Sequence, residues 1–291
     1  MSWIKTILVQ IVLLFTLFFG IDFAYTSWVN YSIENIETKY RIKHDFYHHS
    51  FLSSFDGVGV WEGGKTTYRV CTDSNGFKAS CDSIYSERKS FDLAFIGDSF
   101  TESIGLPYED TFVGMVANDN PKLSIANLGV ASYSPTIYFS KIKWLLDKGF
   151  IFSHIYVFID ISDIQDESRY SRDTEGRVFE VVNKQIHATQ VTKQFFIKNF
   201  SLSTSGYIFL KRFLFPKKKG GEDSYLFILE DNNRSAWTHN QNLSDYGEIG
   251  VNGSIDKAVS EMVKLYELLK ENNMKLSVGV CQALLIIELS F

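Results

Sequence analysis

The chain has 291 residues, a formal net charge of -5 at pH 7 and 45% hydrophobic residues. This length allows one large or two small domains with a sizeable core, and the acidic balance argues against a general nucleic-acid-binding protein, which usually carries a basic face. The sequence contains no zinc-type histidine spacing and no P-loop. It therefore calls for neither a metal nor an organic cofactor.

The first element is an uncharged apolar run from Thr6 to Ile21. A membrane span needs about 20 apolar residues, and the aromatic residues Trp3, Phe23 and Trp28 extend this run into the membrane interface. We expect residues 1–24 to be an uncleaved single-pass anchor in an inner membrane, with the rest of the chain in the periplasm or outside. A cleaved signal peptide is the alternative, although no A-x-A site follows the run.

Residues 25–89 are predicted to form a polar, partly helical stalk followed by irregular strands and turns. Within this segment Cys71 and Cys81 enclose the turn-rich loop TDSNGFKAS. Such a loop can bring two cysteines within bridging distance, and export to an oxidising compartment would preserve the bridge. We expect a Cys71–Cys81 disulfide. Two unpaired thiols are the alternative, and Cys281 is left over.

From residue 90 onward the pattern alternates between strands and helices. Strands are expected at 91–97, 122–130, 154–162 and 275–280, and helices at 109–119, 134–149 and 253–273, the last two capped by Ser134 and Ser254. This alternation predicts an α/β domain at 90–291 with a parallel sheet covered by helices on both faces. An insertion at about 164–253 is expected to contain a hairpin at 172–182, a helical stretch at 188–215 and an exposed loop at 216–224.

A serine follows the first of these strands, in the stretch FDLAFIGDSFTES. Ligands of open α/β sheets bind beyond the carboxyl ends of the strands, and the free N–H groups of a helix start could stabilise a developing oxyanion there. Ser99 is therefore a candidate nucleophile, with a helix-capping serine as the alternative. The neighbouring Asp98 is expected to bond local backbone groups.

Three stretches together resemble the conserved blocks of the SGNH/GDSL hydrolase family. IGDSFTES resembles the first block, ANLGVASYSP the second, and VFIDISD stands where the third block, Gly-x-Asn-Asp, would stand. The resemblance implies a three-layer, flavodoxin-like sheet, with Ser99 as nucleophile and Gly129 as an N–H donor of the oxyanion hole. The third block has Asp160 in place of the glycine and Ser162 in place of the asparagine. Ser162 is then a candidate oxyanion donor, because a hydroxyl can donate one hydrogen bond.

The family also implies a histidine base within an Asp-x-x-His block near the carboxyl end. Here the chain continues from Val280 as CQALLIIELSF and has no such block. We expect that the C-terminal part is missing or altered after 280, by truncation or frameshift. The alternative is that ALLIIELSF forms a final strand or helix.

An Asp-x-x-His pair does occur at the opposite end of the chain, formed by Asp45 and His48. A triad depends on spatial proximity and not on chain order, so His48 is a candidate substitute base. A structural or substrate-facing role for His44, His48 and His49 is the alternative.

These observations predict an ester hydrolase or O-acyltransferase that acts on acyl esters of cell-envelope glycans or lipids through a Ser99 acyl-enzyme. The alternative is an envelope protein that binds glycan without turnover, because the Asp-x-x-His block is absent. A membrane-tethered scaffold is a third reading. The expected partners are the membrane, through the N-terminal helix, and an acylated glycan or lipid substrate, without nucleic acid.

Overall fold

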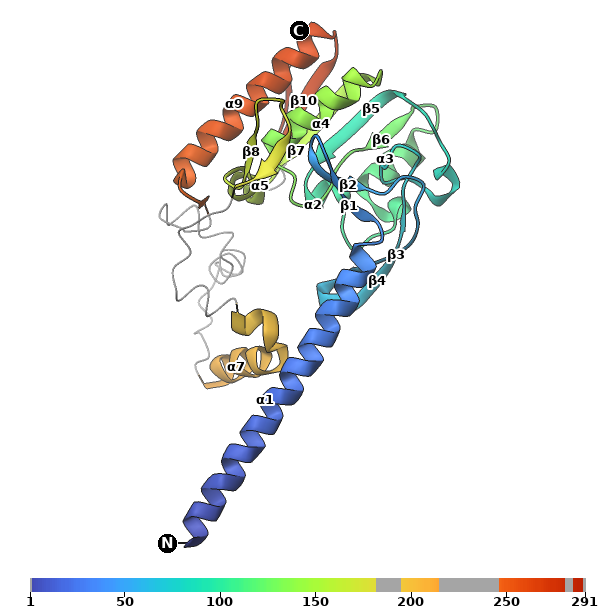
Figure 1. Ribbon diagram of the computed structural model, residues 1–291. Coiled ribbons are helices and arrows are strands. Elements are labelled where there is room, and N and C mark those ends of the chain that lie inside the picture. Colours follow the sequence, from blue (N-terminus) through green and yellow to red (C-terminus); the bar gives the residue numbers. More distant parts are fainter. Residues whose placement is uncertain (1, 182–194, 215–245, 281–284, 290–291) are drawn as a thin grey trace. The chain divides into compact units, whose positions relative to one another are not determined.

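The computed structural model describes residues 2–181, 195–214, 246–280 and 285–289 (Figure 1). It has a mixed α/β fold and separates into two compact units, one made of residues 1–35 and 186–227 and the other of residues 36–185 and 228–291. Part of the expected insertion belongs to the same unit as the N-terminal helix.

The helices, in chain order, are α1 (Ser2–Glu37), α2 (Ser99–Glu102), α3 (Phe112–Asp119), α4 (Pro135–Asp147), α5 (Ile161–Glu167), α7 (Ser201–Leu214) and α9 (Gly250–Glu271). The strands are β1 (Arg41–His44), β2 (His48–Phe51), β3 (Asp56–Trp61), β4 (Thr66–Cys71), β5 (Ser90–Gly97), β6 (Ile125–Asn127), β7 (Ile151–Ile159), β8 (Tyr170–Arg172), β9 (Val178–Glu180), β10 (Lys275–Val280) and β11 (Leu285–Leu289). Short 3-10 helices cover Glu62–Gly64, Cys81–Ser83 and Tyr108–Asp110.

Helix α1 contains the predicted anchor. The stretch Trp3–Glu37 has a mean hydropathy of 2.3 in its most apolar window, and only 6% of that window is buried. By length and composition the helix can cross a membrane. It continues through the expected boundary at residue 24 because the polar segment that follows contains no glycine or proline before Glu37 to end it.

The central sheet has the strand order β11-β10-β7-β5-β6, in which β10, β7, β5 and β6 are parallel. These four strands are the ones predicted from the sequence. Numbered by their position in the chain, they follow the order 2-1-3-4 from β6 to β10, so the order reverses between β5 and β7. Such a switch point is where open α/β sheets bind ligands.

The stretch Leu285–Leu289 pairs antiparallel with β10 as strand β11. Within the described residues, this pairing agrees with the alternative prediction that ALLIIELSF forms a final strand.

Helix α4 begins where the sequence predicts, but a distant side chain caps it. Ser134 occupies the N-cap position without a capping hydrogen bond of its own. Glu167 at the end of α5 accepts hydrogen bonds from Ser134 Oγ at 2.6 Å and from the Thr136 backbone N–H at 2.9 Å. The predicted Ser254 cap of α9 is wrong: the helix begins at Gly250, and the Ser254 hydroxyl donates to the Gly250 carbonyl inside its first turn. A serine can form this back-bond within a helix as well as cap one.

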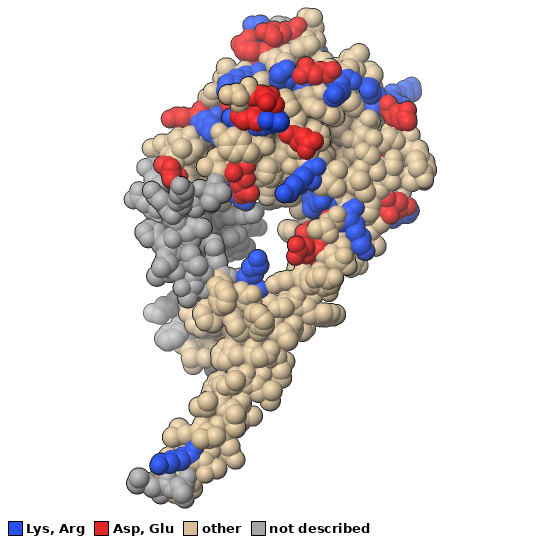
Figure 2. Space-filling view, in the orientation of Figure 1, with Lys and Arg blue, Asp and Glu red and all other residues tan. Residues whose placement is uncertain are grey.

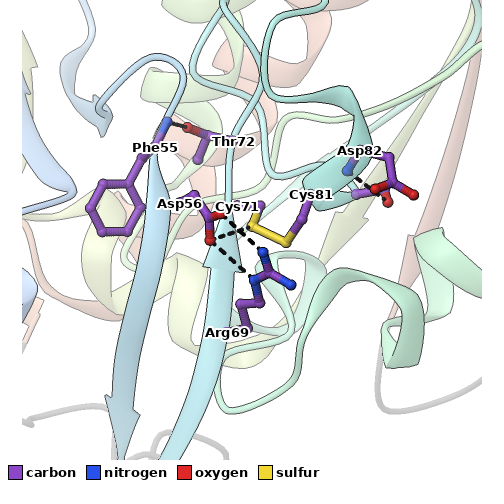
Figure 3. Close-up of a disulfide and its surroundings, with 8 residues drawn as sticks. Phe55, Asp56, Arg69, Cys71, Thr72, Cys81 and Asp82 are labelled. Carbon is purple, nitrogen blue, oxygen red and sulfur yellow. Dashed lines mark hydrogen bonds and ion pairs between the residues drawn. A yellow bond between two sulfur atoms is a disulfide. The ribbon is translucent and has the colours of Figure 1, made fainter.

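The segment before the sheet folds into two antiparallel hairpins, β1–β2 and β3–β4. The predicted disulfide is present: Cys71 and Cys81 are joined with their Cα atoms 5.1 Å apart (Figure 3). Beside it, Arg69 and Asp56 form an exposed ion pair across β3 and β4. The bridge ties β4 to the segment that leads into β5.

Two parts of the expected insertion are described. The hairpin is confirmed as β8 paired antiparallel with β9, and residues 195–199 and α7 are helical, as expected. Residues 182–194 and the expected loop at 216–224 lie outside the described residues.

Candidate functional site

The pairing of β5 with β7 brings the first and third sequence blocks together. Gly97, the last residue of β5, is the register partner of Phe158 near the end of β7. Because parallel strands end at the same edge of a sheet, Asp98 and Ser99 leave β5 beside the point where Asp160 follows β7. The site therefore lies at the switch point of the sheet.

Ser99 is half-buried and begins the single-turn helix α2. Asp98 caps this helix, since its Oδ1 accepts a hydrogen bond from the Phe100 backbone N–H at 2.9 Å. The prediction that Asp98 bonds local backbone is thus confirmed. Its Oδ2 has a second role, accepting from the hydroxyls of Ser99 and Ser162, each at 3.1 Å. One carboxylate oxygen therefore joins the first and third blocks.

Helix α2 is held in place by a partly buried ion pair at its end. Glu102 has a side chain that is only 2% exposed, and it binds the Arg41 guanidinium through both carboxylate oxygens at 2.5 and 3.0 Å. Glu102 also accepts from the Ala131 backbone N–H at 2.7 Å. Lys78 donates to the backbone carbonyls of Glu102 and Ser103, and burial lowers the pKa of Lys78 to about 8. These contacts fix the turn that carries Ser99.

Gly129 packs directly against α2. A Cβ at this position would lie 2.7 Å from the Glu102 backbone nitrogen, so only glycine permits this approach. The Gly129 N–H donates to Asn127 Oδ1 at 3.0 Å, while Asn127 Nδ2 donates to the Thr101 carbonyl at 3.0 Å. The second block thus reaches the site, but the N–H expected to hold an oxyanion is already engaged by Asn127.

The third block forms the start of α5. Asp160 caps this helix and accepts from the Ser162 and Asp163 backbone N–H groups, while Asp163 accepts in return from the Asp160 N–H at 3.1 Å. This reciprocal pair is a capping box, so Asp160 caps the turn that follows β7. The Ser162 hydroxyl donates to Asp160 and Asp98, so in this structure its proton is directed at carboxylates.

Three buried carboxylates meet at this site. One oxygen from each of Asp98, Asp160 and Asp163 lies within 4.8 Å of the others, and Asp163 Oδ1 has no hydrogen-bond partner among the described residues. Burial and, to a lesser degree, the neighbouring negative charges raise the pKa of Asp98 and raise that of Asp163 well above its usual range. A proton or a cation would relieve this repulsion. Sequence reasoning did not predict the cluster, because it depends on the register of β5 with β7.

Replacing Asp163 with asparagine is expected to stabilise the fold at neutral pH by roughly 1–3 kcal/mol, because the amide carries no charge where burial and the neighbouring Asp98 and Asp160 disfavour one. The amide oxygen would still accept from Tyr138 Oη, which lies 2.7 Å from Asp163 Oδ2. The amide would also remove one of the three neighbouring negative charges of the cluster. Because the folded pKa of Asp163 is raised, the wild type loses stability as the pH rises above the ordinary aspartate value of about 3.9.

Denaturant unfolding of D163N and wild type at pH 5 and pH 8 measures this effect. The variant should gain more at pH 8 than at pH 5. An equal loss of stability at both pH values would contradict the account of the cluster.

The proposed Asp45–His48 pair does not form a catalytic dyad in this structure. Asp45 is exposed between β1 and β2, and no hydrogen bond joins it to His48 within the described part of the chain. His48 Nδ1 lies 2.7 Å from His49 Nδ1 instead, and burial lowers the pKa of His48. The described hydrogen bonds of Ser99 include no histidine; His187 and His239 lie outside the described residues.

His49, for which the sequence suggested a structural or substrate-facing role, supports the second block. His49 Nε2 lies 2.8 Å from the Ala131 carbonyl oxygen, two residues after Gly129, and therefore donates to it. Burial lowers the pKa of His49 to about 3, so the ring is neutral at physiological pH. His49 is thus a positioning residue for the loop that contacts α2. Its adjacency to that loop is set by long-range packing, which spacing in the sequence does not reveal.

Comparison with models of protein families finds no match for this chain, and comparison with curated protein sequences finds none either. The resemblance to the SGNH/GDSL hydrolases therefore rests on the three blocks themselves.

Proposed function

We propose that this chain is an SGNH/GDSL-like protein with a three-layer, flavodoxin-like domain, and that Ser99 is the nucleophile of an ester hydrolase or O-acyltransferase. The observation that carries this proposal is the convergence of the three blocks. Ser99 and Ser162, far apart in the sequence, share Asp98 Oδ2, and Gly129 packs against the helix that Ser99 begins. The place where they meet is the switch point of the sheet.

Asp98 is the proposed base, because it is the group that the Ser99 hydroxyl already contacts. The Ser99 oxygen attacks the ester carbonyl carbon and passes its proton to Asp98. Asp98 then returns the proton to the leaving alcohol oxygen as the ester C–O bond breaks. Water or a sugar hydroxyl resolves the acyl-enzyme by the reverse sequence. The raised pKa of Asp98 makes it a stronger base than an ordinary aspartate.

The oxyanion would form near the Ser99 N–H, with Gly129 and Ser162 as further donors. Both of these groups now donate elsewhere, to Asn127 and to carboxylates. Because loss of one oxyanion donor costs on the order of 10²–10³ in rate, we expect turnover to be slow.

A second candidate function, binding of an acylated glycan or lipid without turnover, is favoured by the same contacts. Buried carboxylates lie where negative charge would develop, and the described partners of Ser99 include no histidine. Under either function we propose that α1 anchors the chain in the inner membrane and that the sheet domain faces the periplasm.

Hydrolysis of p-nitrophenyl acetate by the full chain in detergent tests the proposal. Wild type should release p-nitrophenol above the rate of an equal concentration of Ser99→Ala. Asp98→Asn should also lose this activity, whereas Ser103→Ala, which alters an exposed hydroxyl of the same turn bonded to the Phe100 carbonyl, should keep it. Equal rates for wild type and Ser99→Ala would refute the catalytic proposal and leave the binding function.

A further inference from the structure

Asp22, which follows the apolar run of α1, holds the start of helix α7 against α1 by hydrogen bonds. Asp22 is completely buried. Its two carboxylate oxygens accept from the backbone N–H groups of Leu202 at 2.9 Å and Ser203 at 2.8 Å, and from the Ser203 hydroxyl at 2.5 Å. Asp22 thus satisfies two free N–H donors of the first turn of α7 with a side chain from another helix, and Thr26 of α1 accepts from the Ser201 N–H.

Aromatic and polar contacts extend this attachment along α1. The Phe200 ring lies 5.9 Å from Phe19 and 5.8 Å from Phe23 between ring centroids. Further along the helix, Asn30 Nδ2 donates to the Lys198 carbonyl at 2.8 Å. Residues 198–203 are therefore fixed on α1 by hydrogen bonds and ring contacts on both sides of Asp22.

The docked segment leaves a large apolar surface uncovered. In Figure 2 the surfaces of α1 and α7 are tan over most of their length. Tyr207 is 66% exposed and Phe209 is 69% exposed. On a water-soluble domain, large apolar side chains this exposed occur singly and seldom in a cluster. The other exposed apolar side chains of this segment are Phe195, Phe196, Ile197, Leu202, Ile208, Leu210 and Leu214.

The depth of Asp22 along the membrane-spanning helix indicates what covers this surface. Asp22 follows the uncharged run that ends at Ile21, and a helix rises 1.5 Å per residue, so Asp22 lies about 24 Å from the start of the run. The hydrocarbon layer is about 30 Å thick, so this distance places Asp22 within roughly 6 Å of its far edge. Helix α7 therefore begins at the depth where amphipathic helices lie in a membrane interface.

We propose that residues 195–214 are a second membrane-binding element, embedded in the interface of the bilayer that α1 spans and held there by Asp22. The exposed apolar side chains of this segment continue the apolar surface of α1, which is the reason for assigning the lipid bilayer as their partner. A groove of about 380 Å³ lined by Phe196, Ile197, Ser203, Thr204, Tyr207 and Ile208 opens on this segment and can accept lipid chains. The proposal does not depend on Ser99 or on catalysis.

Depth-dependent quenching tests the proposal on the full chain in nanodiscs of phosphatidylcholine and phosphatidylglycerol. In a Cys281→Ser background, an environment-sensitive NBD fluorophore is attached at Phe209→Cys and, as the matched control, at Tyr85→Cys, a site 79% exposed in the other unit. We expect brominated lipids to quench the label at 209 at least twofold and to leave the label at 85 unchanged. A label at 209 that emits as in water, or that is shielded but not quenched by brominated lipid because protein covers it, would overturn the proposal.

The role of Asp22 is tested with the same label at position 209. Asp22→Ala should reduce the quenching, because the Leu202 and Ser203 N–H groups of α7 then lose their acceptor on α1. Ser32→Ala serves as the control, since its exposed hydroxyl bonds only within α1, to the Trp28 carbonyl. Quenching that is unchanged in Asp22→Ala would remove Asp22 from the proposal.

Discussion

Replacing Glu102 with alanine is expected to lower the free energy of unfolding by roughly 1–3 kcal/mol, because the partly buried Arg41 then keeps only its longer ion pair with Glu37 at 3.7 Å. Arg41 is paired with Glu102 through two hydrogen bonds, and although burial opposes its charge, the Glu102 carboxylate raises the pKa of Arg41 overall. The same substitution removes the acceptor of the Ala131 N–H. Denaturant unfolding of the full chain in detergent, compared with wild type, measures the loss.

A matched exposed ion pair gives the control for this experiment. Lys143 and Asp147 on α4 lie 3.0 Å apart, with side chains 44% and 59% exposed. Asp147→Ala should therefore cost less than about 1 kcal/mol. If Glu102→Ala were as mild as Asp147→Ala, the ion pair would not be what fixes α2.

Acid unfolding of the His49→Gln variant is expected to take up about one proton fewer than acid unfolding of wild type. Burial lowers the pKa of His49 from 6.5 to about 3 in the folded chain. Between these values unfolding takes up a proton, so stability falls as the pH falls, by about 1.4 kcal/mol per pH unit for a single group. Glutamine can still donate to the Ala131 carbonyl but does not titrate. Between pH 6 and pH 4 the free energy of unfolding should therefore fall less steeply in the variant, by about 1.4 kcal/mol per pH unit.

The neighbouring histidines remain in the variant and supply the rest of the acid sensitivity. Burial also lowers the pKa of His44, to about 4, and that of His48. Unfolding free energies of wild type and variant at half-unit pH steps would separate the His49 contribution. An identical slope in the two proteins would mean that folding does not lower the pKa of His49, against the buried, neutral role assigned to it.

The sequence was sufficient to predict the elements whose information is local. The apolar period and turn residues identify β5, β6, β7 and β10, and the loop between Cys71 and Cys81 identifies the disulfide. Element boundaries were less certain where a cap is not local. Glu167, more than thirty residues away in sequence, caps α4, and Ser254 bonds back to Gly250 within α9.

The candidate site could be predicted in its members but not in its chemistry. Ser99, Gly129 and Ser162 were identified by their position after strands and by the resemblance of their blocks. That Ser162 donates to Asp98, and that the Gly129 N–H is engaged by Asn127, depends on strand register and side-chain packing. The attachment of α7 to Asp22 likewise joins residues about 180 positions apart, a contact that hydrophobic patterning cannot specify.

The central claim is that Ser99 is a nucleophile, and covalent labelling with a fluorophosphonate probe tests it most directly. The full chain in detergent is incubated with the probe, and the modified peptide is identified by mass spectrometry. The account predicts a phosphonylated peptide containing Ser99, with labelling lost in Ser99→Ala and kept in Ser103→Ala. A wild-type chain that takes up no probe, or takes it up equally in Ser99→Ala, would contradict the account and favour binding without turnover.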